Sequence, residues 1–523
     1  MASTPRSKDI AVSRSRSCRR SGRSWRASGV VERTRFGSSG RLALLAAAAA
    51  RRGRVRYLAL ALILVAASSV TAQVERFEIG LRLLALESTW RETTDAERRR
   101  AAVTTIDRAV RSFLELRLGE VALALDCARH RLLGDSDVPA WFDVLAIQPL
   151  QRVVSGETES LVFEIRPAYT AALAIPEGAW AEVRVGDDVP VRTPVPPEVA
   201  SGARIAVSCA NLRGDGVVRL RFGSGETVRR TWNDVVSRVA DLDGRFDALD
   251  RRSRALARRD GLAGTYRGTA RGLLLAIRRL RDGQVPELPI AVEGDLRRAD
   301  RLLHALEQEA VPSRIDSTGD HWWVVQSKSG ATPIRSWVPT AAREKRVPLV
   351  IAAHGLGGSE QLFFEGYGGG RVVELAQARD WIVVAPRVAI LGGVSLDELA
   401  ESVIQQFPVD PTRVYLIGHS MGAMKSVEAA CRHPERFRAV AAIGGGGRVR
   451  PSEALRSLPF FVAAGEADFG LPMARVLDGA LRRAGVTTRL RVFDDCEHML
   501  VVGESLPSVF EFFDGLNDRE SER

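Results

Sequence analysis

The sequence predicts an α/β fold for the C-terminal part of the chain: a doubly wound, mostly parallel sheet, preceded by a mixed helical and β-rich N-terminal region. Two observations indicate this fold. Apolar runs rich in Val and Ile recur roughly every 30 residues, as buried parallel strands joined by crossover helices do. One run leads directly into Gly-His-Ser-Met-Gly and then into a helical pattern. The length of 523 residues predicts more than one domain.

The basic charge of the chain is confined to its beginning. The formal net charge is +11, yet the first 56 residues hold 15 Lys and Arg against 2 Asp and Glu, so the remainder is near −2. This Arg- and Ser-rich stretch, residues 1–56, is expected to bury no core. It is either a basic tail or a wrongly assigned start, with translation beginning near Val55. A nucleic-acid partner is not expected.

A secretory signal peptide is predicted over residues 57–72. Arginines precede the apolar run Leu58–Ala67, and small residues follow it up to Ala72. This order is typical of a signal that is cleaved after its small residues. The run is too short to span a bilayer, which needs about 20 residues. We therefore expect export to the periplasm or the outside, with membrane attachment only if the signal stays uncleaved.

The cysteines give no sign of a metal site. There are five, and none forms a Cys-x-x-Cys pair, so we expect no zinc or iron–sulfur centre and no cofactor. Cys127 could pair with Cys209, and Cys431 with Cys496. Scattered thiols are the favoured alternative.

Residues 73–320 are predicted to form an accessory region of unknown role. The pattern is helical from about residue 75 to 133, strand-like from 141 to 231, and helical again from 233 to 309. The last helical prediction rests on apolar residues three and four apart, namely Val235, Val239, Leu242, Phe246 and Leu249.

Residues 321–516 are predicted to form the catalytic domain, with a polar tail at 517–523. Its strand candidates are Val347–Ala353, Trp381–Ala385, Val414–Ile417, Ala439–Ile443, Phe460–Ala464 and Leu490–Phe493. Ser395 and Glu398 have the spacing of a capping box that opens a helix between two of these strands. A domain of this size leaves little room for a lid.

The central motif is Gly418-His-Ser420-Met-Gly422, between a predicted strand and a predicted helix. In this context a Gly-x-Ser-x-Gly sequence is typical of a tight turn that exposes a nucleophilic serine. The flanking glycines are needed because the turn leaves no space for side chains. Ser420 is therefore the candidate nucleophile.

Serine needs a base, and the base needs a carboxylate to orient it. His498 follows the last predicted strand, where the base is expected in chain order, whereas His433 lies too close to Ser420 in sequence. Asp468 follows the preceding strand and is the favoured acid. Glu466 in the same loop is the alternative.

Acyl transfer also needs donors for the developing oxyanion. We expect one from the backbone N–H of Met421. The other should come from the glycine-rich loop that begins at His354, with Leu356 as the favoured donor and Gly355 or Gly357 as alternatives. His354 itself is expected to be structural.

These motifs, together with Val409-Asp-Pro-Thr-Arg-Val414 and Gly465-Glu-Ala-Asp468, resemble the α/β-hydrolase superfamily. Within it they are similar to dienelactone hydrolases, carboxylesterases and polyhydroxybutyrate-depolymerase-like esterases. The resemblance covers about residues 325–515. Gly366-Tyr-Gly-Gly-Gly370 departs from it and predicts a loose loop that could alter the substrate pocket.

The sequence thus favours an exported serine hydrolase that cleaves a carboxylic ester of unknown size through an acyl-enzyme. The alternatives are a serine peptidase of the prolyl-oligopeptidase kind and a non-catalytic binding protein on a hydrolase fold. Every predicted catalytic group lies after residue 340. We therefore expect a fragment that starts near Ser317 to keep near-normal kcat on a short ester.

Overall fold

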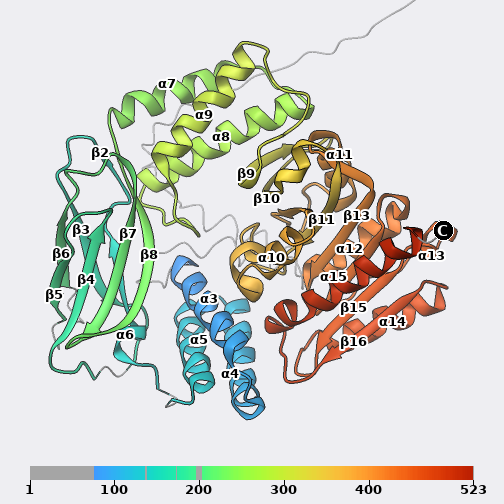
Figure 1. The fold of residues 1–523 in the computed structure, drawn as a ribbon, viewed down its shortest axis with the longest axis horizontal. Helices are drawn as coiled ribbons and strands as arrows, with labels where there is room; N and C mark the ends of the chain where they lie inside the picture. Colours follow the sequence, from blue (N-terminus) through green and yellow to red (C-terminus); the bar gives the residue numbers. More distant parts are fainter. Residues whose placement is uncertain (1–75, 136–137, 172–173, 196–202, 522–523) are drawn as a thin grey trace, which may run out of the picture. The chain divides into compact units, whose positions relative to one another are not determined.

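The computed structural model describes residues 76–521, except 136–137, 172–173 and 196–202 (Figure 1). The predicted basic tail and the predicted signal peptide lie outside the described residues. No helix within the described ranges is long and apolar enough to cross a membrane. The four cysteines that the structure describes form no disulfide with one another, so neither of the two possible pairings is present.

The first described segment is a group of three helices, as the pattern from residue 75 to 133 predicts. They are α3 (Arg76–Glu92), α4 (Ala96–Leu114) and α5 (Leu118–Leu133). Asp95 caps α4 by accepting hydrogen bonds from the backbone N–H groups of Glu97 and Arg98, and Gly134 ends α5 in the left-handed conformation that glycine adopts without strain.

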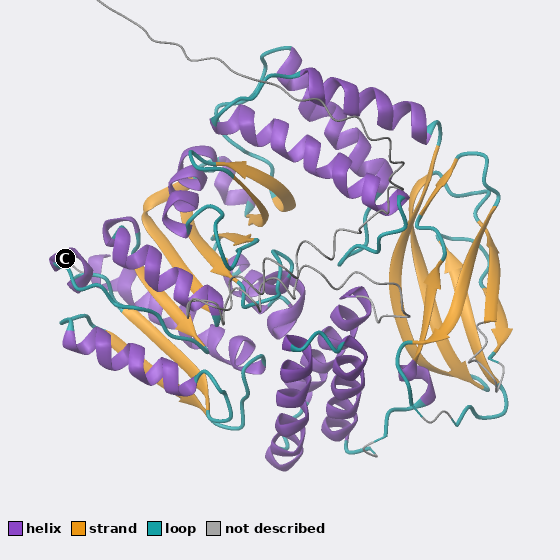
Figure 2. Cartoon of the chain, turned by 180° about the vertical axis from the view of Figure 1, so that it is seen from behind, coloured by secondary structure: helices purple, strands orange, loops and turns teal. Residues whose placement is uncertain are grey.

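Two sheets follow the short helix α6 (Trp141–Val144). Their strands are β1 (Leu145–Pro149), β2 (Val153–Ser155), β3 (Ser160–Pro167), β4 (Ala179–Val185), β5 (Val191–Pro194), β6 (Ala203–Ser208), β7 (Gly214–Ser224) and β8 (Thr227–Val239). The strand orders are β1-β3-β6 and β2-β8-β7-β4-β5, and the two sheets share one apolar core. Figure 2 shows this segment as strand-rich, in agreement with the pattern.

The predicted helix from residue 233 is wrong over its first part. Val235 and Val239 lie in β8, which pairs along its length with β7, and only Leu242, Phe246 and Leu249 lie in helix α7 (Leu242–Ala255). Near the strand–helix junction, this spacing of apolar residues is compatible with a strand as well as with a helix. The first residues form a strand because β7 is available as a long antiparallel partner. Helices α8 (Gly261–Arg281) and α9 (Val292–Glu307) complete the segment.

The C-terminal sheet has eight strands in the order β16-β15-β14-β13-β11-β12-β10-β9. The six predicted strands are present as β11 (Val347–Ala353), β12 (Ile382–Pro386), β13 (Val409–His419), β14 (Ala439–Ile443), β15 (Phe460–Gly465) and β16 (Thr488–Phe493), and their pairings with one another are all parallel. Two antiparallel strands extend the sheet: β10 (Ala331–Val338) pairs with β12, and β9 (Gly319–Gln326) pairs with β10 at the edge.

The edge strand β9 is covered by helix α8. The hydroxyls of Thr265 and Thr269 accept hydrogen bonds from the backbone N–H groups of Gln326 and Val324, at 2.8 and 2.9 Å. An edge with its N–H groups satisfied in this way cannot pair with another chain. Trp323 is buried in this strand.

The connections of this sheet are the short helices η2 (Thr340–Arg343), η3 (Leu362–Gly366), η4 (Tyr367–Gly369) and η5 (Pro434–Arg436), and the α-helices α10 (Arg371–Gln377), α11 (Leu396–Gln406), α12 (Met421–Arg432), α13 (Glu453–Arg456), α14 (Leu471–Arg483) and α15 (Leu500–Ser521). Helix α15 includes residues predicted as a polar tail. Helix α11 begins after Ser395 as predicted, yet the Ser395 side chain makes no capping bond, and Glu398 instead accepts hydrogen bonds from Ser329.

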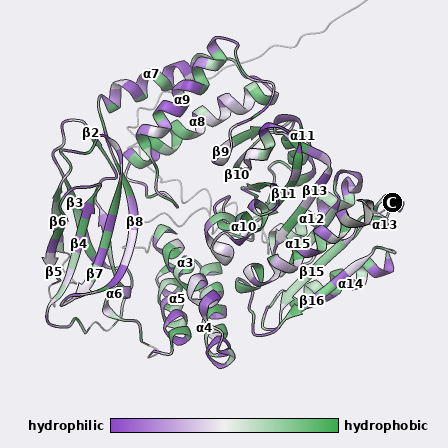
Figure 3. Cartoon of the chain, viewed as in Figure 1, coloured by the Kyte–Doolittle hydropathy of each residue, from purple (hydrophilic) through white to green (hydrophobic). Residues whose placement is uncertain are grey.

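Two apolar layers enclose the sheet, because successive strand residues point to opposite faces. In β11, Leu349 and Ile351 join the layer formed with α7, α8, α9, α11, α12 and α14. Val350 and Ala352 join the layer formed with α3, α4, α5, α10 and α15. The central strands are strongly hydrophobic in Figure 3. Both cores therefore take residues from before and after residue 320, and the described residues all belong to one compact unit.

Candidate active site

Ser420 stands in a strained turn between β13 and α12. Its φ and ψ are 53° and −111°, a combination that costs a non-glycine residue about 1–3 kcal/mol and is usually found at functional sites. The backbone N–H of Ser420 donates to the carbonyl of Ile443 at 2.9 Å, which ties the turn to the end of β14. The strand, turn and helix are those that the Gly-x-Ser-x-Gly pattern predicts.

The glycines on either side of Ser420 are required by space. A Cβ on Gly418 would lie 2.3 Å from the carbonyl oxygen of Gly422, and a Cβ on Gly422 would lie 2.0 Å from that of Ala353. In both cases the obstacle is backbone, which cannot move aside as a flexible side chain can. The close approach of the turn to β11 therefore depends on both glycines.

Asp468 and His498 form a direct hydrogen bond. His498 Nδ1 donates to Asp468 Oδ1 at 2.7 Å, and both side chains are buried. The same carboxylate oxygen accepts from the backbone N–H of Gly470 at 2.6 Å. Glu466, the alternative acid, is exposed. The structure thus brings Asp468, rather than Glu466, to the histidine.

The second nitrogen of His498, Nε2, carries no proton when Nδ1 donates to Asp468, so it is free to accept the proton of a nucleophile. Among the described residues, Ser420 Oγ makes no hydrogen bond to His498, and such a bond often tightens only when substrate is bound. The ring of Phe469 lies against His498, with centroids 3.9 Å apart, and its side chain is also partly exposed. Phe469 therefore shields the imidazole from water at the mouth of the site.

The expected oxyanion donors lie on either side of the turn. Met421 is the first residue of α12, where the N–H has no acceptor within the helix. The N–H of Gly355 donates to the hydroxyl of Tyr367 at 3.3 Å, so Gly355 is not available as the second donor. This leaves Leu356 as the favoured candidate, ahead of Gly357, which has a left-handed φ of 76°.

His354 serves the structure of this loop. Its Nε2 accepts a 3.0 Å hydrogen bond from the backbone N–H of Val388, and its Nδ1 donates to the carbonyl of Gly355 at 2.7 Å. Burial lowers the pKa of His354, which favours the neutral ring that this arrangement needs. The histidine therefore joins the loop after β11 to the loop after β12.

Two buried carboxyl groups near the site were not found by sequence reasoning. Glu497 precedes His498 and accepts hydrogen bonds from the backbone N–H groups of Met499 and Leu500, both at 2.8 Å. Burial raises the pKa of Glu497 to about 7. Glu87 on α3 is also buried, and burial, together with the nearby charge of Glu497, raises its pKa well above its usual range.

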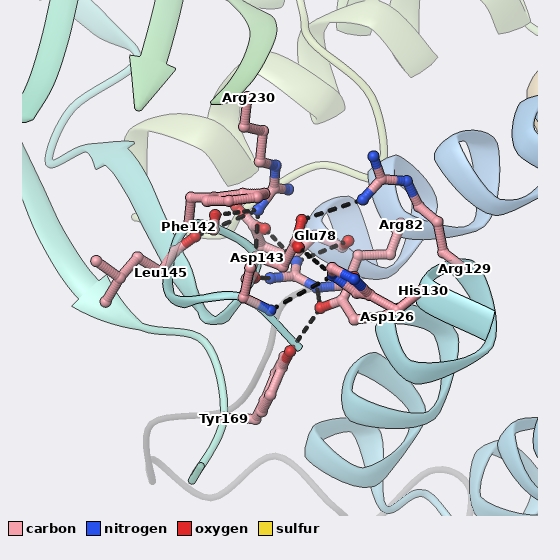
Figure 4. Close-up of polar contacts among 11 residues, drawn as sticks. Glu78, Arg82, Asp126, Arg129, His130, Phe142, Asp143, Leu145, Tyr169 and Arg230 are labelled. Carbon is pink, nitrogen blue, oxygen red and sulfur yellow. Dashed lines mark hydrogen bonds and ion pairs between the residues drawn. The ribbon is translucent and has the colours of Figure 1, made fainter. Parts of the chain in front are cut away.

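A larger buried polar cluster lies away from this site, between α3, α5 and the β-rich segment (Figure 4). Arg82 at its centre donates to Glu78 at 2.6 Å, to Asp126 at 2.9 Å and to the carbonyl of Asp143 at 2.6 Å. His130 bonds to the Asp143 carboxylate at 2.7 Å. Most of these polar atoms bond to one another, as expected of a structural cluster, whereas Nδ1 of His130 is buried without a hydrogen bond.

The family comparison matches part of the chain. Residues 395–457 match the Esterase family, a span that includes the turn at Ser420 but neither Asp468 nor His498. The resemblance to esterases is confirmed for this part of the chain, and the match supports a hydrolase activity. No curated protein matches the chain.

Several solved structures are similar to part of the chain. An S-formylglutathione hydrolase from Agrobacterium tumefaciens is 18% identical, with 38% of this chain and 97% of that chain covered and a TM-score of 0.31. A ferulic acid esterase is 19% identical, with 38% and 99% covered and a TM-score of 0.33. The fluorophosphonate-binding serine hydrolase F of Staphylococcus aureus is 13% identical, with 37% and 98% covered and a TM-score of 0.32. Likenesses this weak say nothing about the substrate.

Proposed function

We propose that the chain is a serine esterase that cleaves a carboxylic ester, with Ser420, His498 and Asp468 as its triad. The observation that carries the proposal is the buried 2.7 Å bond between His498 and Asp468, beside a serine held in a strained strand–helix turn. A base oriented by a carboxylate, close to a serine nucleophile, is the arrangement that acyl transfer requires.

In the proposed reaction, Ser420 Oγ attacks the ester carbonyl while His498 Nε2 takes its proton. Asp468 holds His498 in the tautomer that has Nε2 free and stabilises the cation that forms. The N–H groups of Met421 and Leu356 are the proposed donors to the oxyanion. His498 then returns the proton to the leaving alcohol, and water, activated by the same histidine, releases the acid from Ser420.

The test is to label the full-length protein with a fluorophosphonate, locate the label by peptide mapping, and measure hydrolysis of esters with varied chain length. We expect the label on Ser420, and we expect Ser420→Ala to lose both labelling and hydrolysis while keeping its melting temperature. Labelling or activity that survives in Ser420→Ala would exclude this residue. A wild-type protein that reacts with neither probe would favour the non-catalytic alternative.

We also propose that the protein is exported, on the strength of the signal-like pattern at residues 57–72. Peptide mapping of the native product should find a mature N-terminus after Ala72. Native peptides from upstream of residue 50 would contradict both cleavage and the late translation start.

A further inference from the structure

Tyr367 lies in the glycine loop that departs from the family pattern, and the structure gives this residue a fixed place. Its side chain is fully buried, and its ring meets Phe363 and His419 edge to face, with centroids 4.8 and 5.0 Å apart. Gly368, Gly369 and Gly370 all have positive φ, which turns the chain sharply after Tyr367. The loop is therefore a tight support rather than the loose segment that its glycines predict.

His419, the residue before the nucleophile, is enclosed by the loops around the site. A Cβ on Gly355 would lie 2.9 Å from His419 Nδ1, and a Cβ on Gly444 would lie 3.3 Å from its Nε2. The ring of His498 has its centroid 4.5 Å away. Burial lowers the pKa of His419 well below its usual range, so the ring is neutral.

The hydrogen bonds of His419 fix which nitrogen carries the proton. His419 Nε2 lies 2.9 Å from the carbonyl oxygen of His498, which can only accept, so Nε2 must be the donor. In a neutral ring Nδ1 is then an acceptor, and it receives the O–H of Tyr367 at 2.5 Å. The Tyr367 oxygen in turn accepts from Gly355 N–H. Every donor in this series has an acceptor.

We propose that Tyr367 and His419 are positioning residues that join the oxyanion loop, the nucleophile turn and the backbone of the catalytic base through one directed series of hydrogen bonds. The series begins at Gly355, next to the proposed donor Leu356, and ends at the carbonyl of His498. Neither side chain needs to touch the substrate. The proposal rests on the proposed function. It adds which residues hold the oxyanion loop, the nucleophile turn and the catalytic base in position relative to one another.

The series also links the site to the N-terminal helix α3. Arg91 donates to the carbonyl of Gly368 at 3.3 Å, and the Leu83 and Leu84 side chains lie against Gly366 and Gly369. Helix α3 thus holds the glycine loop that carries Tyr367. The accessory region would act on catalysis through this contact.

The experiment compares Tyr367→Phe with Tyr415→Phe in the full-length protein. Tyr415 is equally buried, and its hydroxyl donates a 2.7 Å bond to Asn517, away from the site. Each variant therefore loses one hydroxyl, with two hydrogen bonds lost at Tyr367 and one at Tyr415. We expect Tyr367→Phe to lower kcat and the rate of fluorophosphonate labelling about ten-fold, with little change in KM, as loss of one positioning hydrogen bond does. Tyr415→Phe should keep both rates.

A second pair of variants covers the case in which Tyr367→Phe does not fold. The side-chain nitrogen of glutamine can reach the position of His419 Nε2, whereas that of asparagine cannot. His419→Gln should therefore retain more kcat than His419→Asn. In the wild type, imidazole nitrogen shifts measured by NMR should show His419 as the neutral Nε2–H tautomer from pH 5 to pH 9.

Three results would overturn the inference: equal loss of kcat in Tyr367→Phe and Tyr415→Phe, equal activity of the two His419 variants, or a protonated or Nδ1–H His419. A wild type that is labelled at Ser420 while these results appear would leave the proposed function standing. A wild type without labelling or hydrolysis would remove both proposals.

Discussion

The indole N–H of Trp90 in helix α3 donates a 2.7 Å hydrogen bond to Glu504 in helix α15. Trp90 is almost fully buried, in the same core as residues of β11, β13 and α15. The first described helix and the last one therefore cover the same face of the C-terminal sheet. This contact decides what to expect of a truncated protein.

A fragment that begins near Ser317 is expected to be unstable, contrary to the expectation from sequence alone. Removing α3, α4 and α5 would uncover the apolar face to which Trp90, Leu83 and Leu86 contribute, and an exposed apolar patch of this kind favours aggregation. Circular dichroism and a melting curve measure the result. A soluble fragment with a cooperative transition and normal kcat on a short ester would restore the modular interpretation.

The proposed acid is tested by a pair of substitutions in one loop. Asp468→Asn should lower kcat by up to about 10⁴-fold, because the amide no longer fixes the tautomer of His498. Glu466→Gln, at an exposed position two residues earlier, should change kcat little. Steady-state kinetics on one short ester measures both. A larger loss in Glu466→Gln would reverse the assignment.

The buried carboxyl groups predict a stability that falls as the pH rises. Burial raises the pKa of Glu497 to about 7 and that of Glu87 well above its usual range. The folded state therefore binds protons that the unfolded state has released, and the stability from these groups is full below the usual glutamate pKa of 4.5 and is lost as the pH rises through 7. Glu87→Gln should raise the melting temperature at pH 8 and weaken its pH dependence. Identical pH profiles for wild type and variant would contradict this.

The polar cluster around Arg82 should contribute to stability rather than to catalysis. Arg82→Leu leaves Glu78 and Asp126 buried without their partner, and breaking a buried ion pair in this way costs about 3–5 kcal/mol. The control is Arg184→Leu, whose partner Asp187 is exposed and whose expected loss is at most about 1 kcal/mol. Urea unfolding measures both free energies. Similar losses would show that the cluster contributes no more than a surface pair.

The sequence by itself determined the strands of the C-terminal sheet and the position of the candidate nucleophile. Buried parallel strands are continuous apolar runs, and the turn at Ser420 needs glycine at 418 and 422 for local steric reasons. Such features depend on neighbouring residues, so they can be read from the chain. Asp468 and His498 were found for a related reason, because chain order places their loops at the same edge of a parallel sheet.

Only the tertiary structure decided how the two halves share their cores and which groups support the site. Val235 and Val239 have helical spacing but lie in a strand, because β8 pairs with β7 as far as Arg238 and with β2 at Val239. Glu398 completes a capping pattern in sequence, yet bonds to Ser329. The roles of Trp90, Glu87 and Tyr367 depend on interactions with residues that lie between about 50 and 400 positions away in the sequence. Spacing along a chain carries no signal for such contacts, since they depend on which apolar faces come together when the sheet is covered.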